Sequence, residues 1–265
     1  ILRTSRNLGI RKRWRAYVDS PLMKAWHKRI IEKCHLGLFH GMDTYQTYTP
    51  WMSPSGHGYV VHNIHDEGLS ENSLSTTLPI ETGNETRLKI LYAGRMAPEK
   101  APEDWANAME KLYELGVYFQ AVWAGDGPLR ESFIRQLDEA NVTALVDTPG
   151  FISDRKKVAE MYRQSDIFVF THVTPESPRC LLESLRFGVP IVGYDSAFAR
   201  DLISHHGGGV LVPINDWQAL AEAILKLAED RPGLESLKCQ ATQDGKRFTS
   251  RAVFSERAEL IKKHI

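Results

Sequence analysis

The spacing of apolar residues becomes regular from residue 88 onward. Short apolar runs suited to buried strands alternate there with stretches whose apolar residues recur at helical spacing. The expected strands are 88–92, 118–123, 144–147, 166–170, 190–194 and 209–212. The expected helices are 102–115, 128–140, 156–163, 178–187, 200–204 and 216–229, with two more in 231–264. This alternation predicts a parallel sheet with helices on both faces.

The predicted fold class is therefore α/β, with a doubly wound, Rossmann-like parallel sheet. Such a sheet binds its ligand at the carboxyl ends of its strands. We expect this domain to span residues 86–232 and to be followed by C-terminal helices in 233–265.

Residues 1–85 have a different composition and form a separate predicted region. The expected elements are an amphipathic helix around 8–34, strands at 35–40 and 58–62, and a polar linker at 66–86. The histidines of this region, His35, His40, His62 and His65, show no recognised metal-site spacing.

Positive charge is concentrated at the N-terminal end of the chain. Residues 1–33 contain ten Lys or Arg and two acidic residues, a net charge of about +8, whereas the whole chain has a formal charge of zero. This asymmetry suggests an anionic partner, with a solvated helix face as the alternative. Because the charge is confined to one end, a nucleic-acid partner is not expected.

Cysteine usage and hydropathy bear on the cellular location of the chain. Cys34, Cys180 and Cys239 are odd in number and far apart, which favours neither a disulfide framework nor a metal site and suggests a reducing, cytoplasmic location. No apolar run reaches the ~18 residues that a membrane span needs. The first residue is Ile and no signal peptide is apparent, so we expect a fragment or a processed chain.

Two loops that follow expected strands contain candidate binding residues. After the first strand, Gly94 allows a tight turn, and Arg95 and Lys100 can converge on a diphosphate, unless both are simply solvated. After the second strand, the Gly-Asp-Gly at 125–127 is weak evidence, because any tight turn favours glycine.

The loop at 149–154 follows the third expected strand, with a turn expected at 149–151. Its exposed backbone and apolar residues, Ile152 among them, could hold a nucleobase, and Ser153 or Asp154 could instead cap the next helix. A nucleobase contact and a helix cap can both be present in this loop.

The most informative segment begins at Thr174 and contains two carboxylates. Glu176 precedes an expected helix that starts near Pro178, and Glu183 lies inside this helix among leucines. Backbone N–H groups at a helix start can hold phosphate. A buried carboxylate can be compensated by two ribose hydroxyls. His172, just upstream, could also face this site, whereas capping or solvation is the alternative for both glutamates.

With these residues, the chain resembles the family 4 (group 1) retaining glycosyltransferases, which have the GT-B fold of two Rossmann domains. The similar region is roughly 58–230. Its motifs are Gly94-Arg95 with Lys100, the loop 150–152, the strand segment 165–169 and the paired glutamates.

The resemblance implies specific roles for these residues. Glu176 would contact the donor sugar, the backbone amides of Arg179 and Cys180 would hold the distal phosphate, and Glu183 would bind the ribose. Arg95 and Lys100 would stabilise the leaving diphosphate during sugar transfer with retention. No metal or other cofactor is expected, and the partners would be a nucleotide-sugar donor and a saccharide or lipid-linked acceptor.

The sequence departs from the family pattern in two places. Six residues rather than seven separate Glu176 from Glu183, so that Pro175 occupies the usual position of the first glutamate, and Ala101 replaces a usual glycine. Residues 1–85 are also too few for a whole acceptor domain, so we expect only a remnant of it.

Three hypotheses about function follow from these patterns. The first is a glycosyltransferase, with possible peripheral contact of residues 1–33 with the inner face of a membrane through Trp14, Trp26 and basic side chains. The alternatives are a nucleotide-sugar epimerase on the same scaffold and a non-catalytic nucleotide-sugar-binding module.

Overall fold

The computed structural model describes residues 10–64 and 87–264, with side chains from residue 21 onward. The predicted linker at 66–86, His65 and the side chain of Trp14 lie outside the described residues. The chain divides into two compact units, one formed by Ile1–His62 with Ser255–Ile265 and the other by Asn63–Phe254.

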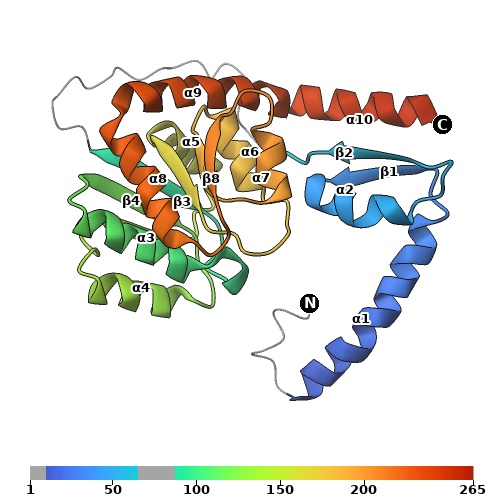
Figure 1. The fold of residues 1–265 in the computed structure, drawn as a ribbon, viewed down its shortest axis with the longest axis horizontal. Coiled ribbons are helices and arrows are strands. Elements are labelled where there is room, and N and C mark those ends of the chain that lie inside the picture. Colours follow the sequence, from blue (N-terminus) through green and yellow to red (C-terminus); the bar gives the residue numbers. More distant parts are fainter. Residues whose placement is uncertain (1–9, 65–86, 265) are drawn as a thin grey trace. The chain divides into compact units, whose positions relative to one another are not determined.

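The larger unit is built on a six-stranded parallel sheet with the order β5-β4-β3-β6-β7-β8 (Figure 1). The strands are β3 (Leu88–Ala93), β4 (Phe119–Ala124), β5 (Val146–Gly150), β6 (Ile167–Phe170), β7 (Ile191–Tyr194) and β8 (Gly209–Val212). Every residue of β6 and β7 is buried, as expected for central strands of a parallel sheet.

Helices cover this sheet in two groups. The helices are α3 (Pro102–Glu114), α4 (Arg130–Glu139), α5 (Arg155–Arg163), α6 (Arg179–Arg186), α7 (Ala197–Leu202), α8 (Trp217–Glu229), α9 (Arg231–Gly245) and the start of α10 (Ser250–His264). Helix α3 packs against α4 and α8, whereas α6 packs against α9 (Figure 1). The predicted α/β doubly wound class is confirmed.

An aromatic cluster fills the core beneath the end of β3. Trp123 lies between Tyr92 and Trp105, with ring centroids 4.0 Å and 5.4 Å away, and all three side chains are fully buried. Both indole N–H groups are satisfied, because Trp105 donates to the carbonyl of Val169 and Trp123 to that of Gly94. These bonds hold the backbone of β6 near its end and the backbone just after β3.

The smaller unit contains a parallel strand pair joined through a helix. It consists of α1 (Ile10–Ile31), β1 (Leu36–His40), α2 (Met42–Tyr48), a 3-10 turn at Thr49–Trp51 and β2 (His57–Val61). The end of α10 belongs to it: the Tyr59 hydroxyl lies 2.9 Å from His264 Nε2, and Arg257 donates to the carbonyl of His62. None of the helices within 10–64 and 87–264 combines the length and the hydrophobicity that a membrane span requires.

Three local predictions were wrong, and one helix was missed. The third strand is Val146–Gly150 rather than 144–147, and the predicted turn at Pro149 lies in this edge strand, where a missing N–H is tolerated. Helix α7 begins at Ala197 rather than at residue 200. The Ser196 hydroxyl caps it by accepting a hydrogen bond from the N–H of Ala199. Helix α2 was not predicted.

Candidate functional site

The direction of the sheet connections reverses between β3 and β6. The chain moves from β3 to β4 and β5 in one direction, and from β6 to β7 and β8 in the other. The loops after β3 and β6 therefore diverge at the centre of the sheet, and such a switch point is where open α/β sheets bind ligands. Most of the predicted donor-site residues lie in these two loops or at the start of α6.

Hydrogen bonds hold the loops after β3 and β6 together. The Thr171 hydroxyl lies 2.7 Å from the carbonyl oxygen of Lys100 and 3.0 Å from that of Ala101. The N–H of Val173 donates to the carbonyl of Glu99 over 3.1 Å. The short 3-10 turn Pro98–Lys100 is thereby fixed beside the segment that contains Glu176.

Lys100 and Glu176 form an ion pair across these loops. Lys100 Nζ lies 2.5 Å from Glu176 Oε1, and the two side chains are 12% and 28% exposed. Arg95 is exposed at the start of the same loop, directly after Gly94. The structure thus brings Lys100 and Glu176 together and leaves Arg95 at the surface.

Ala101, at the end of this turn, has a left-handed backbone with φ 40° and ψ 61°. Glycine adopts this conformation without strain, and a residue with a Cβ does so at a cost. The glycine that the family resemblance leads us to expect here is therefore explained by the backbone conformation, which Ala101 also adopts.

The second carboxylate, Glu183, is engaged at both oxygens. Arg155 Nη2 lies 2.7 Å from its Oε1, and the Tyr162 hydroxyl donates to its Oε2 over 3.3 Å. The Glu183 side chain is 14% exposed. Neither Arg155 nor Tyr162 was predicted as a site residue, because only the tertiary fold places α5 beside α6.

The start of α6 lies between the two carboxylates. Arg179 is its first residue and is exposed, and Pro178 precedes it in the N-cap position. Burial raises the pKa of the Cys180 thiol to about 12; the Lys100 charge lowers it in part, and Glu183 and Glu176 raise it further. The Cys180 thiol is therefore protonated and lies near both glutamates. The part of Cys180 that can bind an anion is its backbone N–H group.

The predicted nucleobase loop follows β5. Phe151 is 78% exposed, whereas Ile152 is partly buried against the core. Asp154 Oδ1 accepts a 2.9 Å bond from the N–H of Lys156 and caps α5. The capping alternative therefore holds for Asp154.

The glycines of the 125–127 turn have a packing role. A Cβ on Gly125 would lie 1.9 Å from the carbonyl oxygen of Gly94, and a Cβ on Gly127 would lie 2.3 Å from that of Met96. The loops after β3 and β4 therefore touch through backbone atoms, which requires glycine whether or not a ligand binds there.

His172 follows β6 and is only 4% exposed. Its Nε2 lies 2.9 Å from the hydroxyl of Tyr92, and its Nδ1 lies 3.7 Å from Glu176 Oε1. His172 is thus buried next to the Lys100–Glu176 pair. Among the described residues, no group of three or more His, Cys, Asp or Glu side chains is arranged to hold a metal ion.

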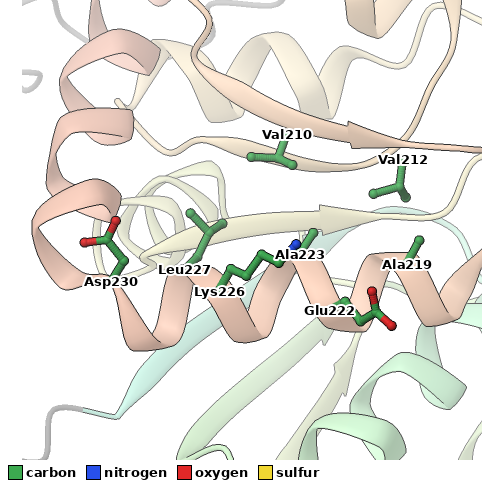
Figure 2. Close-up of a pocket in the computed structure, with 8 residues that line it drawn as sticks. All are labelled: Val210, Val212, Ala219, Glu222, Ala223, Lys226, Leu227 and Asp230. Atoms are coloured by element: carbon green, nitrogen blue, oxygen red, sulfur yellow. The ribbon is translucent and has the colours of Figure 1, made fainter.

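A separate hollow of about 450 Å³ lies between the edge strand β8 and helix α8 (Figure 2). The residues that line it are Val210, Val212, Ala219, Glu222, Ala223, Lys226, Leu227 and Asp230. None of these is a predicted site residue, so the hollow is distinct from the site at the switch point.

Comparison with known proteins gives the family. A family model described as "Glycosyl transferases group 1" matches residues 76–244, more than half of the chain. The fold is a doubly wound, Rossmann-like domain, and the chain belongs to the group 1 glycosyl transferases. The family predicted from the sequence motifs is confirmed.

Two curated relatives show the level of similarity. The chain is 30% identical over 155 residues to the GDP-mannose-dependent alpha-(1-6)-phosphatidylinositol dimannoside mannosyltransferase of Mycobacterium tuberculosis, covering 58% of this chain and 39% of the relative. It is 27% identical over 149 residues to the 2-deoxystreptamine N-acetyl-D-glucosaminyltransferase of Niallia circulans, covering 56% and 38%. The chain thus matches less than half the length of each relative.

Solved structures confirm the fold. The complex of Anabaena Alr3699/HepE with UDP superposes with a TM-score of 0.70 at 19% identity, covering 86% of this chain and 64% of that one. Because both curated relatives are named as glycosyltransferases, the family gives no support to the epimerase alternative.

Proposed function

We propose that this chain is the donor-binding part of a glycosyltransferase, which transfers a sugar from a nucleotide-diphosphate sugar to an acceptor hydroxyl with retention. The observation that carries the proposal is the placement of Lys100, Glu176 and Glu183 around the start of α6, at the switch point of the sheet. The cation and the helix N-terminus suit the anionic diphosphate, and the two carboxylates can accept hydrogen bonds from the hydroxyls of the sugar and the ribose.

Each part of the donor has a proposed partner. The backbone amides of Arg179 and Cys180 bind the distal phosphate, Glu183 accepts hydrogen bonds from the ribose, and the backbone around Ile152 binds the base. Gly94 lets the chain turn close to the diphosphate. Asp154 supports the base site indirectly, because it caps the helix that follows Ile152.

The chemistry at the sugar depends on charge. When the bond between the sugar and the diphosphate breaks, negative charge develops on the leaving phosphate, and Lys100 and Arg95 stabilise it electrostatically. Glu176 accepts hydrogen bonds from the sugar hydroxyls and orients the ring for transfer. Lys100 and Glu176 lie on two loops that are joined by the hydrogen bonds of Thr171 and Val173.

Two ion pairs rearrange when the donor binds. Lys100 has three N–H groups, so it can turn from Glu176 to the diphosphate. Arg155 holds one oxygen of Glu183, and the ribose hydroxyls either share or displace this contact. The Tyr162 hydroxyl donates to the other oxygen and keeps the carboxylate in place.

We propose that no metal ion takes part, since Lys100, Arg95 and the α6 amides together supply the positive charge that the diphosphate needs. Donor affinity measured with Mg²⁺ and with excess EDTA tests this. Equal affinity is expected, and a large loss of affinity in EDTA would contradict it.

The proposed acceptor is a saccharide or a lipid-linked saccharide, and a membrane surface is a proposed partner of residues 1–33. On α1, Leu22, Trp26 and Ile30 are 66%, 58% and 42% exposed, and their four-residue spacing places them on one face. Sedimentation with anionic lipid vesicles tests the contact. Substitution of Trp26 by Ser should reduce vesicle binding, and equal binding by both chains would contradict it.

Calorimetric titration with UDP, GDP and ATP tests the donor site itself. Saturable binding of UDP or GDP is expected, and no binding of either would refute the proposal. Incubation with the matching nucleotide sugar then separates the alternatives: an epimerised sugar would favour the epimerase, and binding with no sugar released to water or an acceptor would favour the non-catalytic module.

A further inference from the structure

His172 is a buried polar side chain with one nitrogen that has no hydrogen bond. It lies just beyond β6, and its Nε2 is bonded to the Tyr92 hydroxyl over 2.9 Å. Its Nδ1 is buried, has no hydrogen-bond partner and lies 3.7 Å from Glu176 Oε1. A buried nitrogen without a partner is costly, so its position beside the carboxylate calls for an explanation.

The surroundings of His172 are compatible with an imidazole proton on Nδ1. Burial and then the nearby Lys100 charge hold the pKa of His172 well below its usual value, so that the ring is neutral and has one N–H. Burial also raises the pKa of the Tyr92 phenol, which keeps its proton. The phenol can donate to Nε2, and the imidazole proton then lies on Nδ1, toward the Glu176 carboxylate.

Lys100 and His172 face the same carboxylate oxygen. Lys100 Nζ is 2.5 Å from Glu176 Oε1, within hydrogen-bond distance, whereas His172 Nδ1 is 3.7 Å from it, beyond that distance. With no donor bound, Lys100 therefore holds Glu176. A diphosphate that binds Lys100 removes this contact and leaves the carboxylate, which is 28% exposed in the pair, without its cation.

We infer that His172, oriented by Tyr92, is a positioning residue that hydrogen-bonds Glu176 when the donor diphosphate takes Lys100, and so keeps the carboxylate directed at the donor sugar. The inference rests on the proposed function. A shift of Glu176 Oε1 by less than 1 Å is sufficient, because an N–H···O bond spans about 2.7–3.2 Å.

This role has a consequence that a general packing role lacks. Glu176 contacts the sugar and not the nucleotide, so the loss of His172 should reduce only the affinity that the sugar adds. The quantity to measure is the ratio of dissociation constants for UDP and UDP-glucose, and for GDP and GDP-mannose, by calorimetric titration of the whole chain.

Three variants separate the contributions. His172→Leu removes both nitrogens, and the sugar-dependent ratio should fall about tenfold, while the affinity for UDP or GDP stays within about twofold. In His172→Asn, the side-chain amide N–H can occupy the place of Nδ1, so most of the ratio should be retained. Tyr92→Phe leaves the imidazole without its orienting phenol and should give an intermediate ratio.

The outcomes distinguish the inference from the proposed function. If the unsubstituted chain binds neither nucleotide, the proposed function fails. If it binds the nucleotides but the sugar adds no affinity, or if the ratio is unchanged in His172→Leu, the positioning role is wrong and the donor site stands. A parallel loss of nucleotide and sugar affinity would also overturn it, in favour of a packing role. Circular dichroism shows whether His172→Leu folds. If it does not, Tyr92→Phe is the test: a reduced ratio supports the positioning role, and an unchanged ratio overturns it.

Discussion

Lys100 Nζ and Glu176 Oε1 lie 2.5 Å apart, although their residues are 76 positions apart in the sequence. The two loops that contain them meet because β3 and β6 are neighbours in the sheet. In the proposed complex each group has its own ligand partner, the diphosphate for Lys100 and the sugar for Glu176. In this proposal, the ion pair is the arrangement without donor, and it separates when the donor binds.

Replacing Lys100 with Met should weaken binding of UDP or GDP by about ten- to a hundredfold, because a charge-assisted bond to phosphate is lost. Calorimetric titration measures the change. Lys111→Met is the matched control, since Lys111 lies on α3 with its side chain 41% exposed and paired with Glu114 at the surface. If Lys100→Met and Lys111→Met bind the nucleotides equally well, Lys100 does not contact the diphosphate.

Replacing Glu183 with Ala should weaken nucleoside diphosphate binding by about tenfold or more and leave pyrophosphate binding nearly unchanged, because only the former has a ribose. Competition titrations with the two ligands measure the difference. The substitution also leaves Arg155 without its carboxylate, so the unfolding temperature of the variant must be compared with that of the unsubstituted chain. Equal losses for both ligands would refute the ribose role.

The left-handed backbone at Ala101 predicts a stabilising substitution. Ala101→Gly should relieve about 1 kcal/mol of strain and raise the melting temperature by about 2–4 °C. Ala223→Gly, in the middle of helix α8, is the control and should lower the melting temperature, because glycine is unfavourable in a helix interior. A decrease of the same size in both variants would show that Ala101 is not strained.

The buried His172 predicts a pH dependence of stability. Its pKa is lowered in the folded chain, by burial first and Lys100 second, and lies near 6.5 when unfolded, so the unfolded state binds its proton more readily. Its contribution to stability is therefore present above about pH 6.5 and lost as the pH falls toward the folded pKa. Urea unfolding at pH 7 and pH 5.5 should show a smaller decrease for His172→Asn than for the unsubstituted chain. Identical decreases would show that His172 is not the titrating group.

The sequence predicted the architecture because the apolar pattern of a buried parallel sheet is local. Strands such as Ile167–Phe170 and Ile191–Tyr194 are continuous apolar runs, and their order with the helices allows few topologies. The third strand was misplaced because Pro149 suggests a turn, and only its place at the sheet edge makes it compatible with a strand.

Candidate site residues could be proposed from the sequence where they stand next to strand ends or a helix start, as Lys100, Glu176 and Glu183 do. Contacts that cross the fold could not be predicted in this way. Arg155 and Tyr162 were not proposed, because their contact with Glu183 depends on how α5 packs beside α6. The burial of His172 against Tyr92 likewise depends on the pairing of β3 with β6.

A crystal structure of the chain with whichever of UDP and GDP binds more tightly tests the donor site most directly. The expected complex has the diphosphate within hydrogen-bond distance of Lys100 Nζ and the backbone N–H groups of Arg179 and Cys180, with the ribose on Glu183 and the Lys100–Glu176 contact broken. A nucleotide bound elsewhere, for example in the hollow between β8 and α8, with Lys100 still paired to Glu176, would contradict the proposed site.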